Sequence, residues 1–238
     1  GHWINCQRSG RGIHINESMN KKGIRYEGEW CCDLYHGFGR IVYTETSDVF
    51  TGEFKYGKRF FRGKLEEFHS TDKIKCVYEG EFTDHGDDPE VHPKKNGYGV
   101  AQCYGVEDGV NPTHRFSGHF KDGERLDGAG KMEYIDSLIE IEGNAVHVYE
   151  GEFERNKSAT TVVDHDMYHR VGKGSMTWKN GDTYTGDWAA NQMAGKGCLK
   201  NVDGVYTGAF AADKYSGRGE LQYSIKTTTG AAGKSEPE

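Results

Sequence analysis

The chain has 238 residues, a net charge of −7, 34 glycines, only 4 prolines and 12% aromatic residues. This modest net charge and aromatic content exclude a largely disordered chain, because disordered chains are highly charged and poor in aromatic residues. The excess of acidic residues argues against nucleic acid as a partner, and no apolar run is long enough for a transmembrane helix. We therefore expect a folded, cytoplasmic protein in which glycine and aromatic residues replace much of the usual aliphatic core.

The pattern aromatic-x-Gly-x-aromatic recurs along the chain. A Gly-x-Gly pair follows the second aromatic residue of most copies after seven or eight positions, as Gly37 and Gly39 follow Trp30. An incomplete first copy covers Gly1 to Gly12, so the array has about eight units. The seven complete copies are Tyr26–Trp30, Phe50–Phe54, Tyr78–Phe82, Phe116–Phe120, Tyr149–Phe153, Tyr184–Trp188 and Tyr206–Phe210.

A spacing of two predicts β-strands, because residues two apart lie on one face of a strand. The pairs Asn180-Gly181 and Asp203-Gly204 predict tight primed turns between units. Inside a unit, we expect a connection of about six residues, such as 189–194. Each glycine is expected to leave bare backbone on which an aromatic ring of the neighbouring strand lies. Carboxylates such as Glu29 and Glu152 alternate with the rings and are therefore expected on the opposite, solvent face.

Three departures interrupt this pattern in chain order. Phe61 occupies the first glycine position of its unit. Insertions occur near residues 84–95 and near 155–170, and such excursions often carry the specificity of a repeat protein. We expect the repeat array to cover residues 1–223 and residues 224–238 to form a flexible tail.

The recurring Tyr-x-Gly-x-Trp followed by Gly-x-Gly, as in 26–39 and 184–197, resembles the MORN (membrane occupation and recognition nexus) repeat family. The resemblance covers essentially residues 1–223. It implies an all-β fold, an elongated twisted antiparallel β-sheet solenoid of stacked β-hairpins. It also implies that the aromatic-lined face of the sheet serves as a groove for partners.

We accordingly expect a noncatalytic scaffold or adaptor that binds a protein or peptide, such as a helix or a coiled segment, in a cytoskeletal or membrane-associated assembly. Self-association through the sheet ends is a further expectation. The rings expected to line the partner-binding groove are Tyr26, Trp30, Tyr78, Phe82, Tyr149, Phe153, Tyr184, Trp188, Tyr206 and Phe210.

Two alternatives stay open. The first is a module that binds phosphoinositides or other anionic lipids, which the net charge and the lack of a dense Lys/Arg patch disfavour. The second is the accessory region of a larger multidomain enzyme, since similar repeats accompany enzyme domains in other proteins. Neither alternative changes the expected fold.

Other motifs favour ordinary structural roles. The metal-like cluster of residues 164–169 lies in an insertion, and we expect no metal, cofactor or catalytic centre. The acidic residues of 84–92 are expected to face solvent or a basic partner. One of the adjacent thiols of Cys31 and Cys32 is expected to point inward. The segment 230–235 lacks the first glycine of a phosphate-binding loop.

Overall fold

The computed structural model describes residues 1–16, 23–69, 73–83, 91–105, 112–135, 140–141, 144–158 and 167–224. Within these residues the chain forms β-strands joined by turns, and no helix is long and apolar enough to cross a membrane. The strands are β1 (His2–Ile4), β2 (Gln7–Asn16), β3 (Ile24–Cys31), β4 (Leu34–Tyr43), β5 (Val49–Lys55), β6 (Lys58–Phe68), β7 (Ile74–Phe82), β8 (Lys95–Tyr104), β9 (Pro112–Lys121), β10 (Glu124–Tyr134), β11 (Glu140–Ile141), β12 (Asn144–Arg155), β13 (Tyr168–Trp178), β14 (Thr183–Ala189), β15 (Gln192–Asn201), β16 (Gly204–Ala211) and β17 (Lys214–Tyr223).

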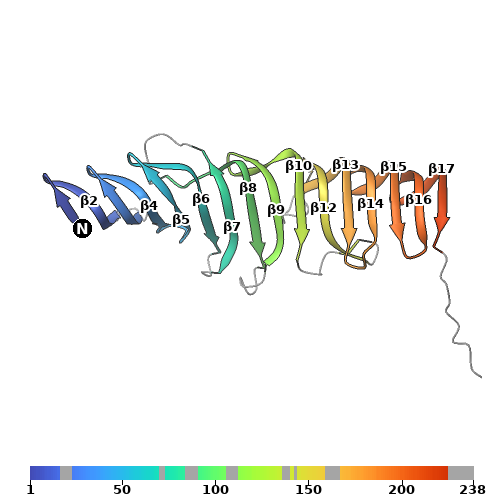
Figure 1. Cartoon of the computed structure of the whole chain (residues 1–238), viewed down its shortest axis with the longest axis horizontal. Helices are drawn as coiled ribbons and strands as arrows, with labels where there is room; N and C mark the ends of the chain where they lie inside the picture. The colour runs from blue at the N-terminus through green and yellow to red at the C-terminus, as the bar shows by residue number, and fades with distance from the viewer. Residues whose placement is uncertain are drawn as a thin grey trace, which may run out of the picture.

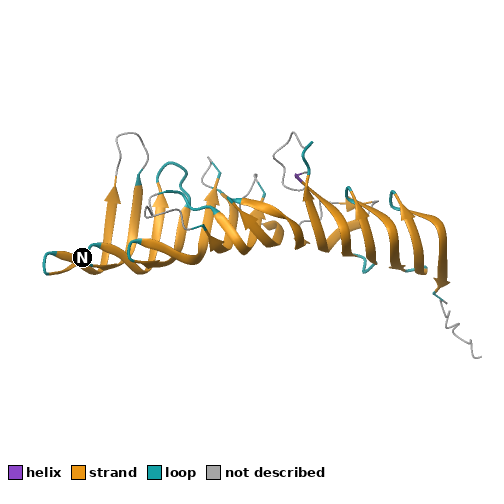
Figure 2. Cartoon of the chain, turned by 90° about the horizontal axis from the view of Figure 1, so that it is seen from above, coloured by secondary structure: helices purple, strands orange, loops and turns teal. Residues whose placement is uncertain are grey.

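The strands form one elongated antiparallel sheet in which each strand pairs with its neighbours in the chain. Figure 1 shows the strands side by side from β2 at one end to β17 at the other. Only the short β11 departs from the sequential order, because β10 pairs directly with β12 and β11 pairs with the start of β12. The predicted all-β fold of stacked hairpins is confirmed. Figure 2 shows that many strands bend along their length, so that the sheet is not flat.

A line of glycines crosses the sheet at right angles to the strands. Each member is directly paired with a glycine on the next strand of the line, and the line runs without a break from β2 to β17, omitting only β11. The register therefore survives both insertions. We call this feature the glycine line; its members are Gly12, Gly28, Gly39, Gly52, Gly63, Gly80, Gly99, Gly118, Gly130, Gly151, Gly174, Gly186, Gly197, Gly208 and Gly219.

One aromatic ring in each complete unit lies over two members of the glycine line. A Cβ atom added at Gly28 would lie 2.4 Å from the Tyr26 hydroxyl oxygen, and one added at Gly39 would lie 2.5 Å from Cε2 of the same ring. Gly28 is on the strand of the ring and Gly39 is on the next strand, which confirms that rings rest on bare backbone. The second ring of the unit, Trp30, packs edge-on against Tyr26 with centroids 5.4 Å apart. Repetition of this pair along the sheet produces one continuous aromatic core.

In the units without an insertion the strands are joined by two residues, so the expected six-residue connection is wrong. Ala189 pairs with Gln192, and the intervening Ala190 and Asn191 have φ of 46° and 72°. Positive φ at both positions matches the twist of a hairpin, so the primed turns lie inside the units. Between units, the hairpin predicted at Asn180-Gly181 is present, but only Gly181 has positive φ there. The turn type predicted at this place is therefore wrong.

These inner turns also connect one unit to the next. The carboxylate of Asp213 accepts a hydrogen bond of 2.6 Å from the amide of Met193, and the amide of Asp213 donates to the Met193 carbonyl at 3.2 Å. Asn191 makes the same two contacts with Arg170, at 2.8 Å and 3.1 Å. The Asp or Asn at the second turn position thus satisfies backbone groups of the preceding unit, and neighbouring units stabilise one another as in other repeat proteins.

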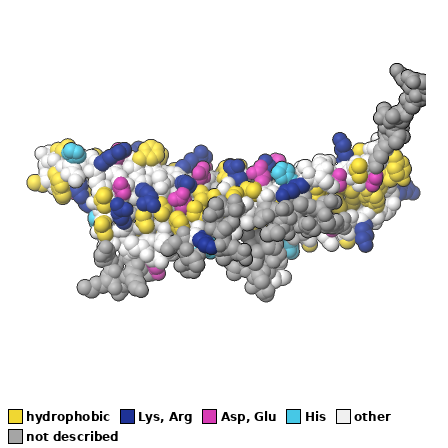
Figure 3. All heavy atoms as spheres, turned by 90° about the horizontal axis from the view of Figure 1, so that it is seen from below, with side chains coloured by type: hydrophobic (Ala, Val, Ile, Leu, Met, Phe, Trp, Pro, Cys, Tyr) yellow, Lys and Arg dark blue, Asp and Glu magenta, His cyan; other side chains and the backbone are white. Residues whose placement is uncertain are grey.

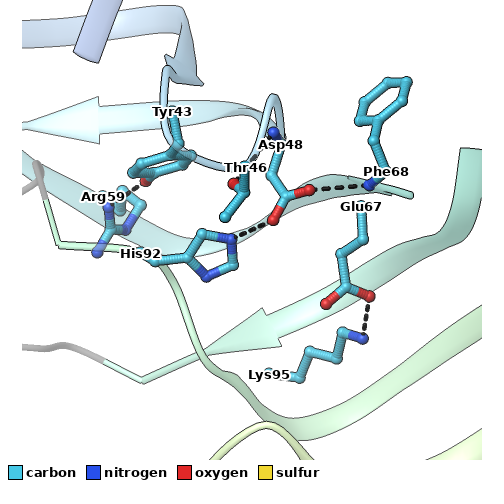
Figure 4. Close-up of polar contacts among 8 residues, drawn as sticks. All are labelled: Tyr43, Thr46, Asp48, Arg59, Glu67, Phe68, His92 and Lys95. Carbon is cyan, nitrogen blue, oxygen red and sulfur yellow. Dashed lines mark hydrogen bonds and ion pairs between the residues drawn. The ribbon is translucent and has the colours of Figure 1, made fainter. Parts of the chain in front are cut away.

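A further contact holds the end of the first insertion to the sheet (Figure 4). The buried carboxylate of Asp48 lies 2.8 Å from His92 Nε2 and accepts a 2.8 Å hydrogen bond from the Phe68 amide. Burial by itself would raise the pKa of Asp48, but these hydrogen bonds outweigh it and hold the pKa below its ordinary value. Nearby, Lys95 lies 2.5 Å from Glu67. His92, expected in an acidic surface patch, therefore has a structural contact.

Candidate functional site

The ten rings predicted to line a partner-binding groove lie on one face of the sheet, but they are buried. Their exposed fractions run from 0% for Tyr26 to 7% for Tyr206. A buried ring offers almost no contact area to a partner. The prediction that these side chains contact a partner directly is therefore wrong, and we assign the ten residues to the core.

Six of the seven first rings are covered because the next strand supplies a side chain that lies over the ring. Tyr35 stacks on Tyr26 with centroids 3.9 Å apart, and Tyr215 stacks on Tyr206 at 3.8 Å. In the middle of the array the cover is a cation: the guanidinium of Arg125 lies 4.3 Å from the Phe116 ring centroid. We call these side chains the lid residues; they are Tyr35, Arg59, Lys95, Arg125, Arg170 and Tyr215.

The lid cations keep their charge beside the rings by different means. Burial lowers the pKa of Arg170 below its ordinary value, and this guanidinium donates a 3.0 Å hydrogen bond to the Asn191 carbonyl. Burial also acts to lower the pKa of Lys95, but the Glu67 carboxylate outweighs it and the pKa is raised. Both cations gain from the negative face of the aromatic ring. Apart from one recess lined by Phe50 and Phe82, the ring face is thus a closed layer and not an open groove.

The open concave surface lies on the opposite face, over β12 to β17. It has a volume of about 890 Å³ and follows the glycine line, with Gly174, Gly186, Gly197 and Gly208 as its floor. The side chains beside these glycines alternate with the buried rings along each strand, so they point away from the core. We call this surface the C-terminal groove; its other lining residues are Glu150, Lys173, Ser175, Thr185, Lys196, Cys198, Thr207, Ala209 and Arg218.

The groove is open because several of the side chains that flank its floor are small. Ser175, Thr185, Thr207 and Ala209 flank the floor and leave the glycine backbone accessible. Larger side chains occupy the equivalent positions of the first complete unit, where Arg40 follows Gly39 as Ser175 follows Gly174. The groove therefore depends on which residues flank the glycine line, and not on the line itself.

Cations outnumber carboxylates in the lining of the groove. Lys173, Lys196 and Arg218 line it together with a single carboxylate, Glu150. Asp187 lies beside these residues, where it forms an ion pair with Lys173 and accepts a 2.7 Å hydrogen bond from the Lys196 amide. The groove is consequently suited to a partner with acidic side chains at its margin. Elsewhere, Figure 3 shows a face on which Lys, Arg, Asp and Glu side chains are interspersed along the molecule.

Carboxylates of the outer face have a role that the sequence alone did not indicate. Glu152 Oε1 accepts a 3.0 Å hydrogen bond from the Lys173 amide, beside Gly172, whose φ is 58°. Asp187 makes the equivalent contact one unit later. The prediction that Glu29 and Glu152 lie on the opposite face to the rings is confirmed. The structure adds that Glu152 holds the irregular backbone of the neighbouring strand.

The remaining motifs do not form a site among the described residues. No group of three or more His, Cys, Asp and Glu side chains in that part of the chain could hold a metal ion. Of the cluster at 164–169, only His169 lies in the described part, in β13; the acidic stretch 84–90 and the segment 230–235 lie outside it. Cys31 and Cys32 are both exposed with sulfur atoms 3.6 Å apart, so the expected inward thiol is wrong.

Sequence reasoning missed both the lid residues and the groove. A lid residue stands two positions before the first glycine of most Gly-x-Gly pairs, as Tyr35 stands before Gly37 and Arg170 before Gly172. For the groove, the signal was the run of small outer-face residues after position 174. Both signals become readable once the register is known, because only the register places these residues beside a ring or beside the glycine line.

Comparison with known proteins agrees with the resemblance noted from the sequence. The family model for the MORN repeat matches residues 26–45, 169–183, 184–205 and 206–228. The last three matches include every lining residue of the C-terminal groove except Glu150. No curated protein matches the chain. MORN repeats are found in scaffold or adaptor proteins, and the family is generally noncatalytic.

Proposed function

The chain contains MORN repeats, and on this premise we propose that it is a noncatalytic scaffold that binds a helical segment of a protein partner in the C-terminal groove. The observation that carries the proposal is the open concave surface over the backbone of Gly174 to Gly208, on the face away from the aromatic core, where several flanking side chains are small. Bare backbone lets a partner approach closely, and small flanking side chains leave room for its apolar side chains.

A helix suits this groove better than an extended peptide. The lining runs from Glu150 on β12 to Arg218 on β17, across six strands. With strands about 4.8 Å apart the groove is about 24 Å long, which is the length of a helix of about 16 residues. The backbone groups beneath the floor are already paired in the sheet, so a crossing strand could not hydrogen-bond to them. A helix satisfies its own backbone groups and needs only side-chain contacts.

The charges suggest what the helix should carry. Its buried face should be small and apolar to match Gly186, Cys198 and Ala209, and acidic residues at its margin would meet Lys196 and Arg218. The long stiff sheet would then hold this segment at a fixed place relative to other partners. This is the role of a scaffold, and it requires no catalytic group.

The proposal can be tested by filling the groove. Thr185→Trp and Thr207→Trp place a large side chain on an exposed position over the floor, and the core should not change because both residues face away from it. We expect each variant to keep the urea midpoint of the wild type and to lose the partner. Thr51→Trp, an exposed residue beside Gly52 in β5, is the matched control.

Cys198 supplies a direct readout because it lines the groove. In a background in which the exposed Cys6, Cys31 and Cys32 are Ser, a photo-crosslinker on Cys198 should capture the bound segment. The captured peptide should be helical by circular dichroism when synthesised and bound to the protein. Crosslinks that persist in Thr185→Trp, or a captured segment that binds without helical signal, would refute the proposal.

A further inference from the structure

The end of the β5–β6 hairpin carries a concentration of positive charge that is unusual for this chain. Residues 55–64 contain five Lys or Arg and no Asp or Glu, although the chain as a whole has a net charge of −7. The expectation that the chain lacks a dense Lys/Arg patch is therefore wrong for this hairpin. Arg62 forms an ion pair with Glu81 and Lys64 forms one with Glu66, so the attraction for a negatively charged partner comes from Lys55, Lys58 and Arg59.

The same hairpin exposes large apolar side chains. Tyr56 is 70% exposed, Phe60 48% and Phe61 63%. They line a recess of about 600 Å³ whose floor is formed by the buried rings of Phe50 and Phe82. Exposed apolar surface beside a recess is characteristic of a binding site. We call this recess the hairpin pocket.

Cations and rings of the hairpin pocket are in contact with one another. The Lys55 ammonium lies 5.6 Å from the Phe60 ring centroid, and the Arg59 guanidinium lies 5.7 Å from that of Phe50. Lys55, Lys58 and Arg59 all line the recess, and none of the described residues lining it is Asp or Glu. A ligand that enters it would meet apolar rings and positive charge together.

Phe61 is held in the pocket at a conformational cost. Its φ is 42°, whereas the equivalent position in β4, β8, β13, β15 and β17 is a glycine with φ between 54° and 60°. A bulky L-residue in the left-handed region costs roughly 1–2 kcal/mol. Strain of this kind is often retained where it positions a functional side chain. The strain at Phe61 is thus a second observation that points to the hairpin pocket, independent of its charge.

We propose that the hairpin pocket binds an acidic peptide segment of a protein partner that carries a bulky apolar side chain. The apolar side chain enters the recess beside Phe60 and Phe61, and the flanking carboxylates meet Lys55 and Arg59. A recess accommodates a side chain, whereas a bilayer is bound by side chains that protrude, so the concave shape favours a peptide over a lipid surface. The hairpin pocket lies on β5 to β8 and shares no lining residue with the C-terminal groove.

Phe61→Gly provides a test in which unfolding cannot explain a loss of binding. The substitution removes the ring from the pocket, and it restores the glycine that other units have at this position, so the variant should be at least as stable as the wild type. Lys55→Glu reverses one charge at an exposed position. Phe38→Ser removes an exposed ring of β4 that does not line the pocket and serves as the matched control.

The probe is a display library of random peptides selected on the intact chain, followed by fluorescence anisotropy with the enriched peptides. We expect enriched sequences with several Asp or Glu residues around one Phe, Trp or Leu. Their affinity should fall roughly tenfold or more in Phe61→Gly and in Lys55→Glu, remain unchanged in Phe38→Ser and in Thr185→Trp, and weaken with salt.

Three outcomes would overturn the proposal. One is that the selection enriches neutral or basic peptides, or enriches no peptide at all. Another is binding that is equal in the wild type and Phe61→Gly. The third is that no peptide binds, that vesicles of phosphatidylcholine and phosphatidylserine bind the wild type, and that Phe61→Gly abolishes the vesicle binding. This result would assign the pocket to a lipid surface. Because the C-terminal groove has its own variants, failure here leaves the proposed scaffold function to be judged separately.

Discussion

Gly197→Ala tests the central packing relation of this fold, a ring lying on paired glycines. A Cβ atom at position 197 would lie 2.4 Å from both Cε2 and the hydroxyl oxygen of Tyr184. Carbon atoms in contact prefer about 3.5–4.0 Å, so the ring would have to move by about 1 Å or more. It has no room to move, because Trp188 and Phe210 pack edge-on against it with centroids 5.1 Å and 5.0 Å away.

The expected loss of stability follows from these contacts. Overpacking a core costs about 1–3 kcal/mol. Displacing Tyr184 would also weaken the 2.9 Å hydrogen bond from its hydroxyl to the Asp187 carbonyl, for about 1 kcal/mol more. We therefore expect Gly197→Ala to lower the free energy of unfolding by about 2–4 kcal/mol. Thr185→Ala, on the exposed outer face of the adjacent strand, should change it by less than about 0.5 kcal/mol.

A second background separates the clash from any other effect of the methyl group. In Tyr184→Ala the ring is absent, so Gly197→Ala should cost nothing and should stabilise the strand by up to about 1 kcal/mol, since Ala loses less backbone entropy than Gly. The four proteins can be compared by urea unfolding, with the fluorescence of Trp178 and Trp188 as the signal. The two substitutions should couple by about 2–5 kcal/mol. Equal costs of Gly197→Ala in both backgrounds would refute the ring-on-glycine explanation.

Three further predictions concern single polar contacts. Asp48→Asn should cost about 1–3 kcal/mol at neutral pH. The folded state lowers the pKa of Asp48, so the ionised carboxylate stabilises the fold above the ordinary carboxylate pKa, and this stabilisation is lost as the pH falls through the lowered pKa. A pH series of urea midpoints for the wild type should show this loss, and the same series for the variant should lack it. Arg170→Met replaces a buried lid cation with an apolar side chain of similar length, so it should leave the stability of the fold unchanged or raise it. Arg170→Ala should lower the stability measured by thermal unfolding by about 2 kcal/mol or more, because it uncovers the rings of Tyr149 and Trp188. Glu152→Ala should cost about 1 kcal/mol and speed hydrogen exchange of the Lys173 amide, while equal exchange rates would contradict the contact.

The tyrosine hydroxyl explains why the pattern is strict in some units and loose in others. Tyr26 and Tyr78 donate hydrogen bonds of 2.7 Å and 2.9 Å to the carbonyls of Glu29 and Glu81, at the point where the paired strands shift register. The units that begin with Phe50 and Phe116 lack this hydroxyl. These are the units in which Phe61 replaces the first glycine and in which the Gly-x-Gly spacing is eight. The tyrosine hydroxyl and the first glycine of the Gly-x-Gly pair together define the backbone geometry where the register shifts.

Much of the fold could be predicted because its determinants are local. Glycine and aromatic residues two apart, as in Tyr149 and Gly151, indicate strands, and their recurrence sets which strands are neighbours. The inner turns were missed because Ala190-Asn191 is not among the residue pairs that favour a primed turn most strongly. Here hydrogen bonds between Asn191 and the backbone of Arg170 in the previous unit, and not turn propensity, stabilise the conformation.

The sequence by itself determined the repeat, the strands and the rings that form the core, because a spacing of two residues fixes which side chains share a face. Only the tertiary structure decided that Tyr35 and Arg170 cover those rings and that the accessible surface lies at the glycine floor and at Phe61. Exposure is a property of the neighbouring strands. The next strand places a side chain over Tyr26 and over Tyr149, and that side chain is known only when the register of the pair is known.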